Sequence, residues 1–240
     1  MKIWSGLICA ALWASTTAHA DINTLQNNLK NNFPEIPVES VTPTAFDGIY
    51  EVYTGDRIVY TDDKAKYFLV GNLIDLAAQH NITDERQAYL NRIDPKQFPI
   101  KQAIKQVKGN GQHILYVFTD PDCPYCKKLE SELEKVDNTT IYTFMMPITQ
   151  LHPNAFNISA QIWCDKKPYQ AWSNYMLKQQ APTAKTDCKH PIQQNIDFAQ
   201  QHKISGTPTF FLADGSRFGG VRSAEDIQQL LKQVAAKPKS

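Results

Sequence analysis

Three features that define common functional classes are scarce in this chain of 240 residues: charge of one sign, long apolar runs and close groups of metal ligands. The 25 Lys and Arg side chains nearly balance the 24 acidic ones, so the formal net charge is +1. Nucleic-acid binding needs a concentrated basic surface, which this balance does not suggest. No stretch after residue 20 approaches the roughly 20 apolar residues of a membrane span. We therefore expect no nucleic-acid partner and no membrane insertion.

Metal ligands are too scattered to indicate a bound ion. Zinc sites usually combine two close cysteine pairs, or one such pair with two histidines three to five residues apart. The chain has one C-x-x-C and no such histidine pair. Because His113, His152, His190 and His202 stand in separate segments, surface or structural roles are favoured over catalytic ones. We predict no metal and no other cofactor.

The first 20 residues have the three-part pattern of a cleavable export signal. Lys2 precedes an apolar run over residues 3–13, and small residues lead to Ala18-His19-Ala20, which has the A-x-A form of a cleavage site. The run is too short for a membrane anchor. Cleavage after Ala20 would remove one of the 25 basic residues and no acidic one, which leaves a net charge of zero. The pattern predicts an exported protein.

Cysteine usage agrees with export. Without Cys9 in the signal, four cysteines remain, and an even number in an exported protein indicates oxidised pairs. Four cysteines allow three pairings, and a chain of this size does not depend on disulfides for its core. Cys164 in a helical segment and Cys188 in a polar loop favour a structural disulfide, which leaves one pair for chemistry.

Residues 21–80 predict a small N-terminal domain. A short helix over residues 21–30 is followed by turn-separated strand patterns within 46–53, 57–60 and 67–70, which is typical of an antiparallel meander. About 60 residues give a marginal core, so we expect this domain to dimerise through its unpaired edges.

Residues 81–110 predict a helical linker, because core-type side chains are few there. Thr83 is expected to cap a first helix, and Lys101–Lys108 is expected to form a second short one. Gly109-Asn110-Gly111 then ends the pattern.

Residues 111–240 predict the catalytic domain, and with the N-terminal meander they place the chain in the α+β class. Apolar runs and turns predict four strands and three helical regions. The strands are expected over 114–118, 141–145, 209–213 and 216–219, and the helices after Cys123, within 152–203 and from Ser223.

The motif that carries chemistry is Cys123-Pro124-Tyr125-Cys126, delivered by a buried strand to the start of a helix. Unpaired N–H groups and the positive helix end favour a thiolate at Cys123. Cys126, one turn later, suits the resolving thiol that breaks a mixed disulfide. Pro124 fits the first helical turn because its missing N–H costs nothing there. An ordinary disulfide or half of a zinc site remains a minor alternative.

The segment Phe118-Thr119-Asp120-Pro121-Asp122 before this motif, and Gly206-Thr207-Pro208 long after it, resemble the bacterial DsbC/DsbG family. The second cysteine pair, with Trp163 before Cys164, resembles the DsbC branch, whereas Pro124-Tyr125 resembles the DsbG branch. The resemblance covers the whole chain after the signal.

This resemblance implies more than the residues show by themselves. It implies an N-terminal dimerisation domain, a helical linker and a thioredoxin-like domain with a helical insertion. It implies a periplasmic homodimer that acts as a disulfide isomerase and chaperone on misoxidised exported proteins, and that a membrane reductase of the DsbD type keeps reduced. It also implies that Cys123 is the nucleophile, Cys126 the resolving cysteine, and Thr207-Pro208 a cis bond that binds substrate backbone.

Two alternatives stay open at this point: a monomeric oxidase of the DsbA type, and a chaperone whose cysteines are secondary. The N-terminal domain argues against the oxidase. Thioredoxin has an acidic residue six positions before its first cysteine, where this chain has Val117. Asp120 and Asp122 are therefore the candidates for proton handling.

Overall fold

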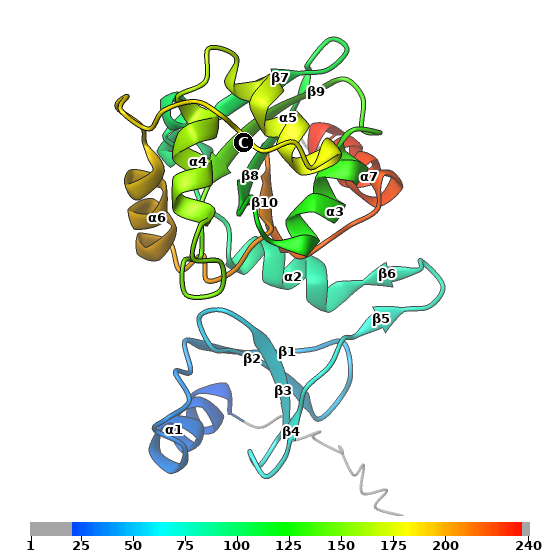
Figure 1. Cartoon of the computed structure of the whole chain (residues 1–240). Helices are drawn as coiled ribbons and strands as arrows, with labels where there is room; N and C mark the ends of the chain where they lie inside the picture. The colour runs from blue at the N-terminus through cyan, green and yellow to red at the C-terminus, as the bar shows by residue number, and fades with distance from the viewer. Residues whose placement is uncertain (1–20, 237–240) are drawn as a thin grey trace, which may run out of the picture. The chain divides into compact units, whose positions relative to one another are not determined.

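A computed structural model describes residues 21–236, so the predicted export signal and its cleavage site lie outside the described residues. The chain divides into two compact units between Gly71 and Asn72. Figure 1 labels the elements of both units in chain order.

The first unit packs one helix on an antiparallel sheet of strand order β1-β2-β3-β4. Leu25 and Leu29 of the helix are fully buried against Val41 and Val52 of the sheet. The prediction of a helix and an antiparallel meander is confirmed, but β1 was not expected. The elements are α1 (Ile22–Asn32), β1 (Ser40–Pro43), β2 (Ile49–Tyr53), β3 (Ile58–Asp62) and β4 (Phe68–Leu69).

The second unit begins with a small hairpin, β5 (Ile74–Asp75) and β6 (His80–Asn81), and the helix α2 (Ile82–Leu90). The predicted cap at Thr83 is wrong. Asn81 caps α2, because its side-chain oxygen accepts a hydrogen bond from Asp84 N at 3.0 Å. Thr83 is instead buried, and its hydroxyl oxygen accepts from Leu73 N at 2.8 Å.

The expected second helix over Lys101–Lys108 is also wrong. Two single 3₁₀ turns, Pro95–Gln97 and Ile100–Gln102, are followed by strand β7 (Ile104–Val107). Ile104 is buried at its start, and the whole strand pairs antiparallel with β9. Ile104 and Gln106 are covered to different degrees, whereas Lys105 and Val107 at the alternate positions are exposed, so one side of this edge strand faces solvent.

The central sheet has five strands in the order β11-β10-β8-β9-β7. Only the β8–β9 pair is parallel, and helix α3 (Pro124–Leu133) makes the crossover between these two strands. In Figure 1 this sheet lies behind α3 and α5. The remaining strands are β8 (His113–Thr119), β9 (Thr139–Met145), β10 (Thr209–Leu212) and β11 (Arg217–Gly219).

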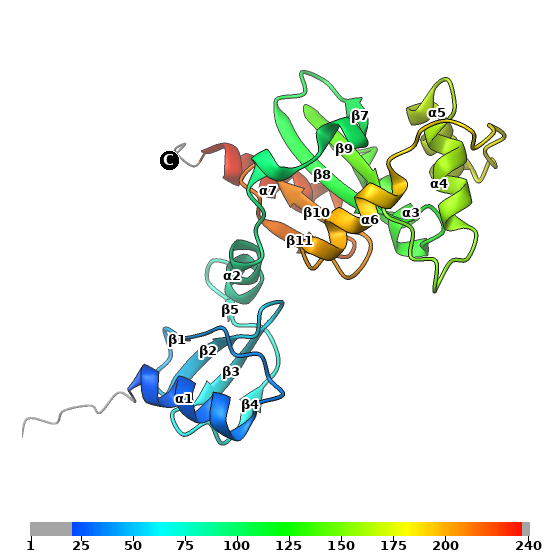
Figure 2. The same ribbon diagram turned by 90° about the vertical axis from the view of Figure 1, so that its left-hand side faces the viewer.

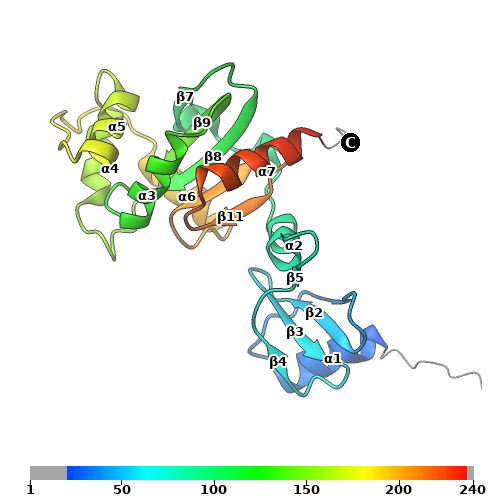
Figure 3. The same cartoon turned by 90° about the vertical axis from the view of Figure 1, so that its right-hand side faces the viewer.

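Helices cover both faces of the five-stranded sheet, as Figures 2 and 3 show from opposite sides. Leu129 of α3 and Ile227 of α7 (Ala224–Ala236) pack with Leu115 and Phe210 on one face. Ala199 of α6 (Ile192–Gln201) joins a largely aromatic cluster on the other face. That cluster includes Phe98, Tyr116, Phe118, Phe144 and Phe211.

The expected helical region within residues 152–203 is three separate helices. They are α4 (Ala155–Trp163), α5 (Pro168–Lys178) and α6, and residues 179–191 between the last two have no regular structure. This insertion between β9 and β10 extends the sheet domain on the side of α3, where α3 contacts α5.

Gly215 holds the β10–β11 turn against the segment after α2. Its φ is +82°, and an added Cβ would lie 1.9 Å from the carbonyl oxygen of Ile93. Ile93 N in turn donates a hydrogen bond to Gly215 O at 3.1 Å. Only glycine combines this backbone conformation with such a close approach.

Membrane spans are absent from the described part of the chain: within residues 21–236 no helix is both long and apolar enough to cross a bilayer.

Candidate active site

Strand β8 and helix α3 place the two cysteines of the C-x-x-C. Cys123 is the N-cap residue of α3, and Pro124 occupies the first helical turn. The Cys123 N–H donates to Asp120 O at 3.2 Å, and the Cys123 carbonyl accepts from Cys126 N and Lys127 N, both at 3.1 Å. The tight turn between β8 and α3 thus fixes the backbone of Cys123 at the positive end of the helix.

Cys123 and Cys126 are free cysteines, and their surroundings differ. Cys123 retains 6% of its surface exposed, against 1% for Cys126. The Cys123 thiol lies 3.6 Å from the carbonyl oxygen of Thr207. Burial raises the pKa of Cys126 to about 12, although Asp120 N donates to its sulfur at 3.4 Å. Cys126 therefore stays a thiol at neutral pH.

Thr207 and Pro208 lie beside this pair because β10 follows them directly and pairs with β8. The Thr207–Pro208 peptide bond is cis. The Thr209 hydroxyl donates to Gly206 O at 2.7 Å, and Gly220 N donates to Pro208 O at 2.9 Å, so the loop is held from both sides. The resemblance implied this cis bond, which the residues alone did not predict.

The residues between the cysteines face outward. Pro124 is exposed, and 67% of Tyr125 is exposed. Leu151, in the loop before α4, is exposed to 69%. Both Tyr125 and Leu151 thus offer exposed apolar surface on this domain.

Both predicted proton-handling candidates lie in the turn before Cys123. Asp120 is fully buried, and Asp122 accepts a hydrogen bond from the hydroxyl of Tyr175 on α5. Burial and this neighbouring carboxylate raise the pKa of Tyr175. The hydroxyl therefore remains a donor to Asp122 at physiological pH.

A further acidic group near the cysteines was not foreseen. Glu130, one helical turn after Cys126, is a charged residue type but is buried, with 5% of its surface exposed. Burial raises its pKa to about 7, and Trp172 on α5 partly offsets this effect. The residue pattern of α3 did not predict this burial. The helix α5, whose Trp172 contacts Glu130, belongs to an insertion far along the chain.

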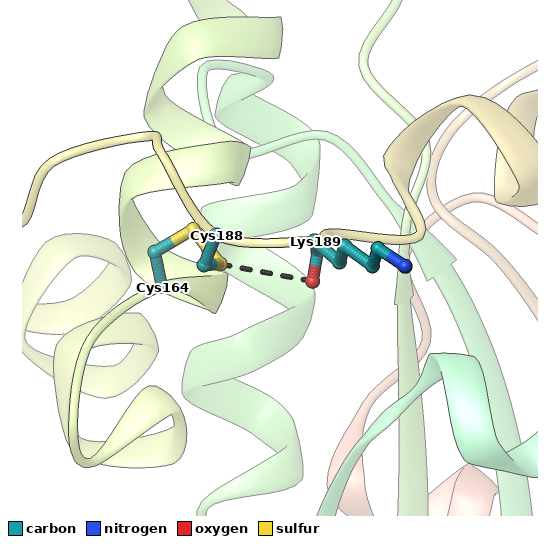
Figure 4. Close-up of a disulfide and its surroundings, with 3 residues drawn as sticks. All are labelled: Cys164, Cys188 and Lys189. Carbon is teal, nitrogen blue, oxygen red and sulfur yellow. Dashed lines mark hydrogen bonds between the residues drawn. A yellow bond between two sulfur atoms is a disulfide. The ribbon is translucent and has the colours of Figure 1, made fainter.

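Cys164 and Cys188 form a disulfide that joins the end of α4 to the loop before α6 (Figure 4). The Cys188 sulfur also lies 3.7 Å from the carbonyl oxygen of Lys189. The bridge spans a loop of sequence separation 24 and is separate from the reduced pair. This pairing uses the two cysteines that lie outside the C-x-x-C.

No group of three or more potential metal ligands occurs among residues 21–236. Three of the singleton histidines have structural surroundings: His113 contacts Gln112, His190 packs on Phe156 and His202 packs on Phe198. The fourth, His152, is hydrogen-bonded to Asp120.

Two family models match the chain. Residues 100–235 match the thioredoxin-like domain, and residues 16–84 match the N-terminal domain of disulfide bond isomerase proteins. The first match covers the whole five-stranded sheet and the C-x-x-C.

Similar proteins agree with these matches. A probable thiol:disulfide interchange protein DsbC of Bordetella pertussis is 35% identical over 208 residues, which is 86% of this chain and 73% of that protein. DsbC of Escherichia coli K12 is 24% identical over 219 residues, 90% of this chain and 89% of that one. A solved disulfide interchange protein from Neisseria gonorrhoeae is 35% identical with a TM-score of 0.55, and covers 57% of this chain and 97% of its own.

Proposed function

Since the chain belongs to the DsbC family of thiol:disulfide interchange proteins, we propose that Cys123 and Cys126 are the dithiol with which it reshuffles incorrect disulfides of exported proteins. The observation that carries this proposal is the pair itself. A slightly exposed, free Cys123 at a helix N-terminus faces the Thr207 carbonyl, and the more deeply buried Cys126 lies one helical turn after it.

The reaction starts at Cys123. Its thiolate attacks one sulfur of a client disulfide, so a mixed disulfide forms and the other client sulfur leaves as a thiolate. That thiolate can attack a different client disulfide, and a client thiolate finally displaces Cys123. This sequence rearranges disulfides without net oxidation or reduction.

Cys126 governs the competing reduction. If its sulfur attacks the mixed disulfide, the client is released as a dithiol and Cys123–Cys126 becomes a disulfide. A thiol with a pKa of about 12 attacks slowly, because the thiolate is the reactive form. The slow step gives the client time to rearrange, which supports isomerisation.

Thr207 and Pro208 are the proposed contact for the client backbone. The Thr207 carbonyl lies next to the Cys123 sulfur, and Pro208 has no N–H to compete for a partner. An extended client segment passing this loop would place its cysteine against Cys123. The exposed Tyr125 and Leu151 would contact its apolar side chains, which also supports chaperone activity.

The isomerase interpretation is favoured over an oxidase of the DsbA type. The chain carries the N-terminal domain of disulfide bond isomerase proteins in addition to the thioredoxin-like domain. This domain also supports a homodimer. Its edge strand β4 ends in exposed apolar residues, since Leu69 and the following Val70 are 55% and 77% exposed.

The remaining parts of the proposal concern location and turnover. We place the protein in the periplasm after cleavage behind Ala20, where the dithiol needs no metal or organic cofactor. An oxidised Cys123–Cys126 pair must receive two electrons, and a membrane reductase of the DsbD type would supply them.

Trapping the thiols in periplasmic extract tests the proposal. Acid quenching followed by a mass-shifting alkylator should find Cys123 and Cys126 mostly reduced and Cys164–Cys188 oxidised. A mostly oxidised C-x-x-C would favour the oxidase instead.

A matched variant separates the two activities. Purified Cys123→Ser/Cys126→Ser protein should lose the reshuffling of a scrambled multi-disulfide protein but keep its suppression of aggregation. Retained reshuffling would contradict the assigned dithiol.

A further inference from the structure

Asp120 combines a buried charge with direct contact to both cysteines. Its side chain is 0% exposed. Its N–H donates to the Cys126 sulfur at 3.4 Å, and its carbonyl accepts from Cys123 N at 3.2 Å. Any movement of the Asp120 backbone is therefore passed directly to both members of the dithiol.

Three N–H donors hold the Asp120 carboxylate. Oδ1 accepts from Asp122 N at 2.8 Å. Oδ2 accepts from Ile148 N at 2.7 Å and faces His152 Nδ1 at 2.9 Å. Two of these donors belong to the loop between β9 and α4, so the carboxylate fastens that loop to the turn that carries Cys123.

His152 is the one basic side chain that forms an ion-pair contact with Asp120 within residues 21–236. A buried carboxylate without a counter-charge is costly, even when it is hydrogen-bonded. His152 remains 22% exposed, so it can exchange its proton with solvent. Histidine is also the side chain whose charge normally changes between pH 5 and 8.

The other charged or titratable groups around this pair cannot take over its role. Asp122 adds a second negative charge, which Tyr175 binds through its hydroxyl. The Lys127 ammonium lies 5.0 Å from the centre of the Tyr175 ring rather than against Asp120. Cys123 and Cys126 are hydrogen-bonded to the backbone of Asp120. The imidazole of His152 is thus the cationic partner available to offset the Asp120 carboxylate.

We propose that His152 is a positioning residue for the exchange reaction: as an imidazolium it neutralises Asp120 and thereby favours the thiolate of Cys123. The inference rests on the proposed dithiol function and adds a residue to it. When His152 loses its proton, the Asp120 charge is uncompensated and disfavours a second negative charge nearby. Cys123 reactivity should then follow two ionisations, its own and that of His152.

Asparagine is the matched substitution, because its side-chain NH₂ can occupy the place of Nδ1 and keep the hydrogen bond without the charge. We would measure the rate of iodoacetamide reaction at Cys123 of the reduced protein from about pH 4 to pH 9, following the Cys123 peptide by mass. A fit of the parent's rate against pH should require two ionisations. The fit for His152→Asn should require one, and this variant should react at least about threefold more slowly near pH 5, because one positive charge near the thiolate is lost.

Two further variants complete the experiment. His113→Asn, at the other end of β8, should keep both ionisations. His152→Leu removes both the donor and the charge, so it should slow the reaction further, because Asp120 then lacks a hydrogen bond as well as a counter-charge. If His152→Asn and the parent have the same number of ionisations, the proposal is wrong, even if His152→Leu fails to fold.

The readout separates the two proposals. Alkylation of Cys123 does not require client turnover, so a two-ionisation profile without reshuffling activity would contradict the proposed function and leave the role of His152 standing. Normal reshuffling by a parent protein whose alkylation profile shows one ionisation would support the proposed function and contradict the role of His152.

Discussion

Glu130 is a carboxylic acid that the folded chain keeps partly protonated near neutral pH. Its pKa is raised by burial to about 7, whereas the unfolded chain has the ordinary value near 4.5. Glu130 lies on α3 on the side of α5, where it is buried instead of exposed as a surface charge.

The raised pKa of Glu130 fixes the sign of a pH effect. The folded state binds the proton more tightly, so the contribution of this group to stability is present below pH 4.5 and is lost as pH rises to about 7. The Glu130→Gln variant has no ionisable group at this position, so its stability does not fall for this reason as pH rises. Between these limits its unfolding free energy should gain up to about 3 kcal/mol relative to the parent, as measured by denaturant unfolding.

Glu225→Gln on helix α7 is the control for Glu130→Gln, because the Glu225 side chain is exposed. It should show no comparable rise of unfolding free energy with pH. A parallel pH dependence of parent and Glu130→Gln would contradict the raised pKa.

At the residue scale, the sequence was informative where chemistry and neighbours are local. The turn and helix start around Cys123 follow from residues next to it, so the roles proposed for the pair could be predicted. The environment of Glu130 could not, because Trp172 comes from a distant helix. His152 was interpreted as structural for the same reason: Asp120, its partner, is distant in sequence.

At the scale of elements, the hairpin β10–β11 depends on one glycine. Gly215→Ala would have to adopt φ +82° and would place Cβ 1.9 Å from Ile93 O. We expect a loss of about 2–3 kcal/mol in unfolding free energy, since a left-handed conformation and a backbone displacement combine. Thermal and denaturant unfolding would measure it.

Gly219→Ala in the same hairpin is the control for Gly215→Ala. A Cβ there meets nothing within 4 Å, and its φ is not in the left-handed region. The substitution should change stability by less than about 0.5 kcal/mol. Equal effects at both positions would contradict the assigned contact.

The disulfide of the helical insertion makes a second prediction at this scale. It joins α4 to an irregular segment through a loop of sequence separation 24. Cys164→Ala/Cys188→Ala should lower the unfolding free energy by about 3 kcal/mol in the chain-entropy model. It should also speed proteolysis within residues 179–191, while Cys123 alkylation stays unchanged. An unchanged unfolding midpoint would show that the bridge does not restrain this loop.

Which elements could be predicted depended on burial. Continuous apolar runs identified β8 and β9, and amphipathic spacing identified α3 and α7. Strand β7 was taken for a helix because this edge strand exposes both Lys105 and Val107. Its four residues are too few to distinguish the helical period from that of a strand. Asn81 caps α2 instead of Thr83, whose hydroxyl is bonded to Leu73 next to the β5–β6 hairpin. The sequence did not predict this, because the short hairpin has no recognisable strand pattern.

At the scale of the whole molecule, the proposed homodimer can be tested at strand β4. Leu69→Glu places a charge on an exposed apolar edge, which opposes pairing between two copies. In sedimentation at micromolar concentration we expect the parent to have the mass of two chains and the variant to shift toward one.

Leu151→Glu is the control for this experiment, because it adds the same charge at an equally apolar and exposed side chain of the other unit. It should leave the mass unchanged and weaken binding of apolar clients instead. Loss of the dimer in both variants would remove β4 as the proposed interface.

The position of β8, with β9 parallel on one side and β10 antiparallel on the other, has a consequence for synthesis of the chain. A ribosome releases β8, α3 and β9 in succession, so the cysteine pair can acquire its helix early. The strand that brings Thr207 and Pro208 emerges only after the whole helical insertion. A nascent chain that stops before β10 therefore presents a formed dithiol without the loop that faces it.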